Sequence, residues 1–156
     1  MNNNSKVRVG FKKTHPDAQL PTKNHNSDAG MDLYAVEDTV INGWDTVKLL
    51  EENSTDTVVP VGLSLAGISS GYFLTVACRS GLGFKHGLSV HNGIIDQDYR
   101  GDLGILMRNN TNTDYHVKKG DRIAQLIILP SYTAQIIESD TEASERGDDG
   151  FGSSGK

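Results

Sequence analysis

Asn-Gly-Ile-Ile-Asp-Gln-Asp-Tyr-Arg-Gly, at residues 92–101, is the stretch of this chain that says most about its fold. Its Asn-Gly pair is a strong hairpin signal, because both residues tolerate the positive φ that a tight primed turn requires. Ile94 and Ile95 follow, and β-branched residues favour a strand directly after such a turn. An edge hairpin with a solvated end does not need the polar side chains that come next, Asp96, Asp98, Tyr99 and Arg100. A structural hairpin and a functional hairpin both remain open from this stretch alone.

Short apolar and β-branched runs, separated by Gly, Asn, Ser and Pro, extend on both sides of this stretch. Besides the strand after the turn, they predict strands at residues 6–11, 39–41, 47–50, 57–59, 62–66, 71–79, 103–107, around Val117, at 122–130 and at 133–138. The only helix expected is a turn or two at residues 80–85, because no other segment sustains a period of 3.6. Many short strands with almost no helix predict an all-β sandwich, jelly roll or barrel.

Composition limits the classes of function that the chain can have. The length of 156 residues predicts one domain, and a hydrophobic content of 36% suits a β-rich fold or a symmetric oligomer. A net charge of −5 argues against non-specific nucleic-acid binding, but a few Arg residues can still make one pocket positive. Cys78 is the single cysteine, so no intramolecular disulfide is expected. With no apolar run resembling a signal peptide or a membrane span, we expect a soluble, cytoplasmic protein that binds neither nucleic acid nor membranes.

Two further segments have more than one interpretation. Asp28 and Asp32 are four positions apart around a Gly, which fits two turn residues better than two carboxylates near a cation. The end of the chain, residues 144–156, has the composition of a flexible tail. However, Phe151 lies between two glycines there and Arg146 precedes it, and an aromatic ring, an Arg and Gly-rich backbone are the parts of a flap that closes on a nucleotide.

Five stretches of the chain, in order, resemble the motifs of the homotrimeric deoxyuridine triphosphatase (dUTPase) family. They are Asp-Ala-Gly-Met-Asp-Leu-Tyr-Ala at 28–35, Arg-Ser-Gly-Leu at 79–82, Gly-Ile-Ile-Asp-Gln-Asp-Tyr-Arg-Gly at 93–101, Gly-Asp-Arg-Ile-Ala-Gln-Leu at 120–126 and Arg-Gly-Asp-Asp-Gly-Phe-Gly-Ser-Ser at 146–154. Each stretch is weak evidence by itself, but five in this order are specific.

The resemblance implies a distorted, β-clip-like jelly roll at residues 1–143, assembled as a three-fold homotrimer, with a flexible arm at 144–156. It also implies active sites at the subunit interfaces, each built from all three chains. The reaction implied is hydrolysis of dUTP to dUMP and pyrophosphate with Mg²⁺, which keeps uracil out of DNA and supplies dUMP for thymidylate synthesis.

The resemblance also assigns a role to each matching residue. Asp96 matches the catalytic base that activates the attacking water, and Asp32 matches a carboxylate that holds Mg²⁺ through water. The residues expected to bind the substrate are Arg79, Ser80, Gly81 and Gln125 at the phosphates, Asn92, Gly93, Ile94 and Ile95 at uracil, Tyr99 at the deoxyribose, and Arg146, Phe151, Gly152 and Ser153 in the arm. The chain departs from a common family pattern at Val90, where many members carry Asn, so His91 or Asn92 would fill that place.

Two alternatives compete with this interpretation. A relative of dCTP deaminases would share the jelly roll and the Arg-Ser phosphate grip, but it would need a Glu beside the pyrimidine. A nucleotide-sensing interaction protein would use the same surface to bind a repressor protein, if the chain comes from a phage. Such members often carry an extra segment before the last motif, and residues 132–145 are short for one.

Overall fold

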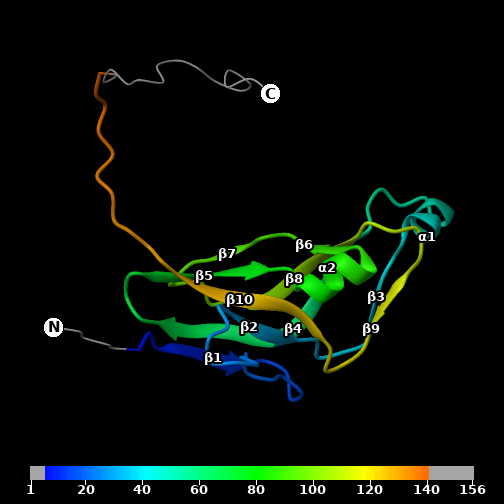
Figure 1. Ribbon diagram of the computed structural model, residues 1–156, viewed down its shortest axis with the longest axis horizontal. Helices are drawn as coiled ribbons and strands as arrows, with labels where there is room; N and C mark the ends of the chain where they lie inside the picture. Colours follow the sequence, from blue (N-terminus) through cyan, green and yellow to red (C-terminus); the bar gives the residue numbers. More distant parts are fainter. Residues whose placement is uncertain (1–5, 141–156) are drawn as a thin grey trace.

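The computed structural model describes residues 6–140, which form ten strands and two short helices (Figure 1). One four-stranded sheet has the order β1-β4-β8-β6, with β1 at Val9–Lys13, β4 at Asp56–Ile68, β8 at Asp102–Asn109 and β6 at Leu88–Val90. A second has the order β2-β10-β5-β7, with β2 at Gly30–Tyr34, β10 at Arg122–Pro130, β5 at Tyr72–Ala77 and β7 at Ile94–Ile95. A small pair joins β3 (Thr39–Ile41) to β9 (Tyr115–Val117), and the helices are α1 (Trp44–Leu49) and α2 (Ser80–His86). The predicted all-β class is confirmed, and within residues 6–140 no helix is long and apolar enough to cross a membrane.

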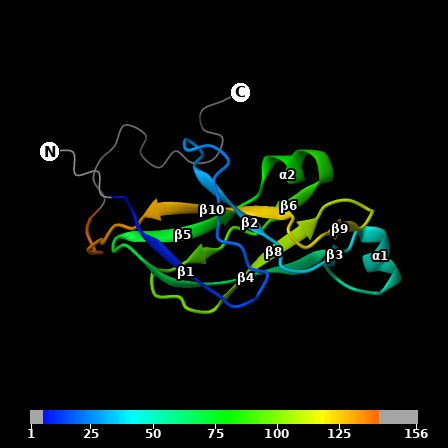
Figure 2. The ribbon, with the colours of Figure 1, turned by 90° about the horizontal axis from the view of Figure 1, so that it is seen from below.

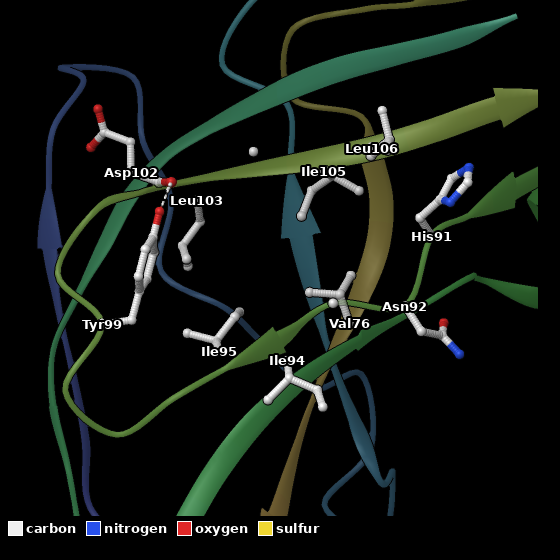
Figure 3. A pocket seen from close by; sticks show the side chains of 12 residues that line it. Val76, His91, Asn92, Ile94, Ile95, Tyr99, Asp102, Leu103, Ile105 and Leu106 are labelled. Carbon is white, nitrogen blue, oxygen red and sulfur yellow. Dashed lines mark hydrogen bonds between the residues drawn. The ribbon is translucent and has the colours of Figure 1, made fainter. Parts of the chain in front are cut away.

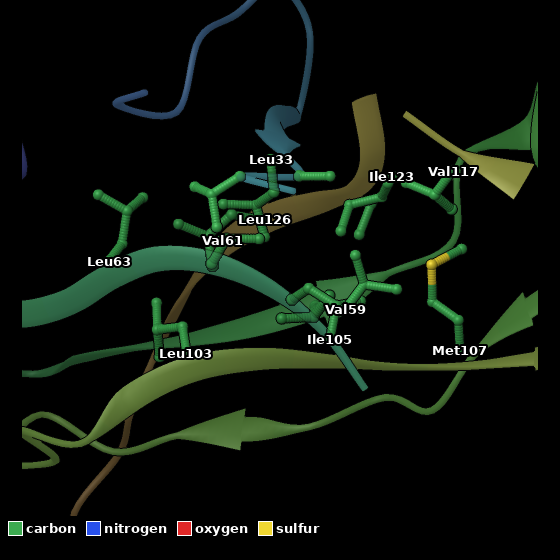
Figure 4. Packing of buried hydrophobic residues seen from close by; sticks show 14 of the residues in the cluster. Leu33, Val59, Val61, Leu63, Leu103, Ile105, Met107, Val117, Ile123 and Leu126 are labelled. Carbon is green, nitrogen blue, oxygen red and sulfur yellow. The ribbon is translucent and has the colours of Figure 1, made fainter. Parts of the chain in front are cut away.

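The core lies between the two four-stranded sheets, which form separate layers in Figure 2. In β8 every second residue is buried, and in β4 the same alternation holds from Val59 to Leu63. These buried residues meet inward-facing residues of β2 and β10 (Figure 4), and buried residues of β5 belong to the same core. The largest fully buried side chains include Leu33, Val59, Val61, Leu63, Leu65, Leu74, Met107, Ile123 and Leu126. The strand predicted at residues 103–107 is confirmed as β8, which extends one residue before and two residues after those bounds.

β4 is one strand of 13 residues, where the sequence predicted two separate strands at 57–59 and 62–66. Its register against β8 shifts between Pro60 and Ser64, which marks a bulge. Gly62 lies in this bulge with a φ of +64°, and a Cβ there would lie 2.5 Å from the Cβ of His15. Glycine allows the strand to bend and continue, so the apparent break is a bend.

The strand predicted at residues 47–50 is wrong, because α1 covers most of this segment. Only Val47 of α1 is buried. A helix and a strand are distinguished by the spacing of their buried residues, and a single buried residue has no spacing. The backbone N–H groups of Trp44 and Asp45 donate to the carbonyls of Thr111 and Asn112, at 3.0 and 3.1 Å. These loop carbonyls satisfy amides that have no partner within the helix.

The strand predicted at residues 133–138 is also wrong. Residues 131–140 are exposed, contain no strand and lead away from the two layers (Figure 1). The preceding strand, β10, already pairs with β2 on one side and β5 on the other, so neither of its edges is free. A segment with β-branched residues does not form a strand here, because no free edge of β10 is left to pair with it.

The turn predicted at Asn92 and Gly93 has a different geometry. The described residues with positive φ are Glu51, Gly62, Gly71, Gly87 and Gly120, so neither residue of the Asn-Gly pair adopts the primed-turn conformation. β6, before the pair, is bonded to β8, whereas β7, after it, is bonded to β5. Asn92 and Gly93 therefore carry the chain from one sheet to the other.

Two strands were not predicted from the sequence, and one helix was predicted correctly. β2 lies where a turn was favoured around Asp32, and β6 was not expected. The helix predicted at 80–85 is confirmed as α2, and β10 has the predicted bounds.

Replacing Gly62 with Ala should lower the free energy of unfolding by about 1–3 kcal/mol, because a side chain would be held at positive φ against His15. Gly67→Ala is the matched control, since it lies in the same strand and a Cβ there would meet nothing within 4 Å. Urea unfolding of both variants at one protein concentration measures the difference. Equal midpoints for the two variants would contradict the bulge argument.

Candidate functional site

Three of the predicted site residues are brought together by the pairing of β10. Gln125 lies opposite Asp32 of β2 on one side and opposite Ala77 of β5 on the other. Two residues after Ala77 the chain reaches Arg79, at the start of α2. The side-chain amide of Gln125 donates to the carbonyl of Cys78 at 3.2 Å, which fixes Gln125 against the end of β5.

A carboxylate lies between two guanidinium groups at this point. Nε of Arg79 donates to Oδ1 of Asp32 at 2.9 Å, and Nη1 of Arg122 donates to Oδ2 at 3.3 Å. Arg79 also donates through Nη1 to the carbonyl of Arg122 at 3.2 Å. The Asp32 side chain is 13% exposed, whereas those of Arg79 and Arg122 are 26% and 47% exposed. The positive groups outnumber the carboxylate and are more open to solvent, so the cluster can attract an anion.

These side chains border a hollow of about 390 Å³, which we call the Arg79 hollow. Its lining comprises Asn24, His25, Asp28, Ala29, Gly30, Asp32, Arg79, Ser80, Gly81, Arg122 and Gln125. Ser80 and Gly81 begin α2, where backbone N–H groups have no partner within a helix, and Ser80 adds a hydroxyl. The structure thus collects Asp32, Arg79, Ser80, Gly81 and Gln125, from three of the motifs, around one space.

Cys78 has a structural environment beside this hollow. Burial raises the pKa of its thiol, so at neutral pH the group stays protonated. It donates to the carbonyls of Arg79 and Leu88, at 3.4 and 3.5 Å. Its role is to pack and to hold the start of α2.

A second hollow, of about 410 Å³, lies beside residues 92–101, and we call it the Tyr99 hollow (Figure 3). It is lined by Val76, His91, Asn92, Gly93, Ile94, Ile95, Tyr99, Asp102, Leu103, Gly104, Ile105 and Leu106. Tyr99 forms one side, with its hydroxyl donating to the carbonyl of Asp102 at 3.3 Å. The carbonyl of Gly93 accepts from the N–H of Val76 at 3.3 Å and from the hydroxyl of Thr75 at 2.9 Å. All the predicted residues of this stretch line one space, except Asp96.

Asp96 is exposed and lies just outside the Tyr99 hollow, in a turn that the N–H of Tyr99 closes by donating to the carbonyl of Asp96 at 3.1 Å. No residue lines both hollows, and no hydrogen bond or ion pair among residues 6–140 connects their linings directly. Within one chain, the predicted base and the predicted phosphate-binding groups are therefore not gathered into a single pocket. The predicted residues Arg146, Phe151, Gly152 and Ser153 lie outside the described residues.

Several residues that line these two hollows were not predicted from the sequence. In the Arg79 hollow they are Asn24, His25 and Arg122, and in the Tyr99 hollow they are Val76 and residues 102–106 of β8. β8 begins only six residues after Asp96, so a strand that returns past residues 92–95 was the available signal for residues 102–106. Asn24 and His25 lie just before the first motif, whose Asp28 accepts a hydrogen bond from the backbone N–H of His25 at 2.8 Å, but the motif itself does not include them.

The Arg79 hollow brings together guanidinium groups, a hydroxyl and helix-start amides, which are groups that can donate hydrogen bonds to an anion. An apolar hollow lies elsewhere on the same β fold. The comparisons with known proteins are more specific. The family model for dUTPase matches residues 16–155. The chain belongs to the dUTPase family of hydrolases, as the five motifs predicted.

Individual relatives agree with this assignment. A deoxyuridine 5'-triphosphate nucleotidohydrolase of Nautilia profundicola is 37% identical over 153 residues, which cover 96% of this chain and 100% of that protein. The protein of the same name from Gloeobacter violaceus is 41% identical over 152 residues, covering 96% and 97%. Among solved structures, the Staphylococcus bacteriophage 80alpha dUTPase with dUpNHpp superposes with a TM-score of 0.80 at 28% identity, covering 97% of this chain and 99% of that one.

Proposed function

We propose that this chain hydrolyses dUTP to dUMP and pyrophosphate by attack of a water molecule on the α-phosphorus. Membership of the dUTPase family and the names of its relatives support the reaction. The observation that carries the assignment of residues is the Arg79 hollow, where residues from three distant motifs meet. The product dUMP would serve thymidylate synthesis, and removal of dUTP would keep uracil out of DNA.

The triphosphate binds in the Arg79 hollow in this proposal. A planar guanidinium at Arg79 can donate two parallel hydrogen bonds to phosphate oxygens. The hydroxyl of Ser80 and the backbone of Ser80 and Gly81 supply neutral donors beside it. Gln125, fixed by its bond to Cys78, contacts a phosphate or the attacking water.

Asp96 acts as the general base. Phosphoryl transfer needs mainly positioning and charge stabilisation, with one group to orient and deprotonate the nucleophile. An exposed carboxylate beside the Tyr99 hollow has access to water and to a ligand that enters from that side.

The nucleoside binds in the Tyr99 hollow. The Tyr99 ring packs against the deoxyribose, where a 2'-hydroxyl would collide with it, so dUTP is preferred over UTP. The backbone of residues 92–95 pairs with the uracil edge, and a mismatched cytosine amino group would leave buried polar groups unpaired. Among the described residues that line this hollow there is no Glu, which a deaminase of dCTP would need.

A complete site then requires more than one copy of the chain. Asp96 and the Arg79 hollow are separate within residues 6–140, so we propose a three-fold homotrimer of distorted, β-clip-like jelly rolls with shared sites. Ile94 is 72% exposed and Phe84 94% exposed, and burying such side chains between subunits would favour assembly.

Mg²⁺ fits the Arg79 hollow as a companion of the phosphates. No group of three or more His, Cys, Asp or Glu residues within 6–140 could form a protein cage for it. Mg²⁺ keeps most of its waters and needs only one or two carboxylates besides substrate phosphates. Asp32 is the carboxylate that would contact a metal-bound water, and the ion would neutralise charge on the phosphates.

The domain boundary belongs to the same proposal. Residues 1–143 form the domain, and residues 144–156 act as an arm that closes over the bound nucleotide. Arg146, Gly152 and Ser153 would contact the γ-phosphate, and Phe151 would stack on uracil. Closure would exclude water and complete the site.

A second candidate function is regulation through a protein partner. The similar phage 80alpha protein is described as controlling the transfer of virulence genes by a G protein-like mechanism. A repressor that recognises the nucleotide-bound form of this chain would be the equivalent partner here. Binding of a purified repressor that depends on dUTP would support this function.

Pyrophosphate release from dUTP with Mg²⁺ should be fast in the wild type and far slower with dTTP, dCTP or UTP. Asp96→Asn should lower kcat by about 10²–10⁴-fold, because the general base is lost. Asp98→Asn, two positions away, is the matched control and should keep most of the activity. A wild type without dUTP hydrolysis would refute the function, and an active Asp96→Asn would refute the role of Asp96.

Shared sites predict complementation between two inactive variants. When Asp96→Asn and Arg79→Ala chains are unfolded and refolded together at equal amounts, about a quarter of the sites should contain both wild-type residues, because each residue comes from a different copy. Steady-state assays of the mixture should recover roughly that fraction of activity. No recovery in a mixture that chromatography shows to be trimeric would place both residues in one copy.

Deletion of residues 146–156 should leave a folded assembly and lower kcat/KM for dUTP by at least about ten-fold, equivalent to ~1.4 kcal/mol of transition-state binding. Ordering an arm costs about 1–2 kcal/mol per residue in backbone entropy, so its contacts with bound nucleotide must be strong. Thermal unfolding and size-exclusion chromatography serve as controls for folding. Unchanged turnover in the truncated protein would exclude the arm from the site.

A further inference from the structure

His91 is a polar side chain of the Tyr99 hollow that lies just before the third motif, and it is one of the two residues that could fill the place of the Asn that many family members carry. It follows β6 directly and precedes the Asn92-Gly93 pair that crosses between the two sheets. In Figure 3, His91 and Tyr99 lie on opposite sides of the hollow. Its backbone N–H donates to the carbonyl of Leu106 in β8 at 2.9 Å.

The imidazole of His91 is attached to a fixed carboxylate. Its Nε2 lies 3.4 Å from Oδ1 of Asp56, the first residue of β4. Arg108 of β8 holds the same carboxylate with two bonds, from Nε to Oδ1 at 2.7 Å and from Nη2 to Oδ2 at 2.8 Å. Asp56 and Arg108 are also directly opposite each other in the β4–β8 ladder, so the acceptor offered to His91 is held by the sheet.

The hydrogen bonds of Arg108 hold the pKa of Asp56 well below its usual range. Asp56 therefore stays ionised at neutral pH, and it accepts a hydrogen bond from either a neutral or a protonated imidazole.

The crossing segment is thus held at both ends, by different sheets. On one side, His91 is bonded to β8 through its backbone and to β4 through its side chain. On the other side, the carbonyl of Gly93 is held by Val76 and Thr75 of β5. Asn92 lies between these two attachments, and both it and Gly93 line the hollow.

We propose that His91 is a positioning residue for the pyrimidine: its bond to Asp56 fixes the backbone of Asn92 and Gly93, which the base contacts. This inference rests on the proposed function, because it assumes that the base occupies the Tyr99 hollow. The Asp56–Arg108 pair has two bonds of its own and does not need the imidazole. Removal of the imidazole should therefore loosen the crossing segment without unfolding the sheet.

The test compares His91→Ala and His91→Gln in the full-length protein, with dUTP and dTTP as substrates. His91→Ala should raise KM for dUTP about five-fold, the value of one ordinary hydrogen bond, and should reduce the preference for dUTP over dTTP. kcat should change by less than about two-fold, because the catalytic base and phosphate grip remain. His91→Gln should restore most of the KM, since its amide nitrogen can donate to Asp56 as Nε2 does.

His116→Ala is the matched control, because His116 is exposed on β9 and lines neither hollow. In an Asp56→Asn background, His91→Ala should add little further change in KM, since the two residues act as one unit. A wild-type KM in His91→Ala, or His91→Gln as impaired as His91→Ala, would overturn the proposal. If the wild type itself failed to hydrolyse dUTP, the proposed function would fail before this comparison began.

Discussion

The hydrogen-bonded ladders on both sides of β10 are the constraint on which the candidate site depends. β10 lies between β2 and β5, and Gln125 is paired with Asp32 across one ladder and with Ala77 across the other. Asp32 and Arg79 are 47 positions apart in the chain, and Asp32 and Arg122 are 90 apart. A slip of one residue in either ladder would turn the side chains of one strand to the opposite face. The buried Leu126, next to Gln125, prevents such a slip, because it would then leave the core.

Arg79 and Arg122 place two guanidinium groups at the Arg79 hollow of an acidic chain, and Asp28 and Asp32 are the carboxylates in its lining. The chain has a net charge of −5, yet Arg79 and Arg122 meet at one carboxylate. Asp32 holds both guanidinium groups in place without an anionic ligand, and because it is the less exposed partner it leaves their outer edges to the solvent. A small anion in contact with these guanidinium groups would be attracted by the local charge, because solvent and salt screen the more distant charges that make up the net charge.

The crossing at Asn92 and Gly93 links the two sheets and also shapes the Tyr99 hollow. A two-residue hairpin would have kept the flanking strands in one sheet and closed the space between them. Because β6 bonds to β8 and β7 bonds to β5, the segment spans the edge of the sandwich and leaves room beside Tyr99. Residues from both sheets, such as Val76 and Gly104, therefore meet in one lining.

Much of the fold and of the site was predictable from local sequence, and the exceptions share one cause. The alternation of Leu103, Ile105 and Met107, the bounds of β10, the helix after Arg79 and the family motifs all depend on residues close together in the chain, so the sequence by itself determined them. The helix at Val47, the lack of a strand at 133–138 and the crossing at Asn92 depend on which distant segment offers a hydrogen-bonding edge or a loop carbonyl. The same holds for Arg122 and His91, whose partners Asp32 and Asp56 lie 90 and 35 positions away. Only the tertiary structure decided these features, because strand pairing between distant segments sets such contacts and no local pattern encodes the partner.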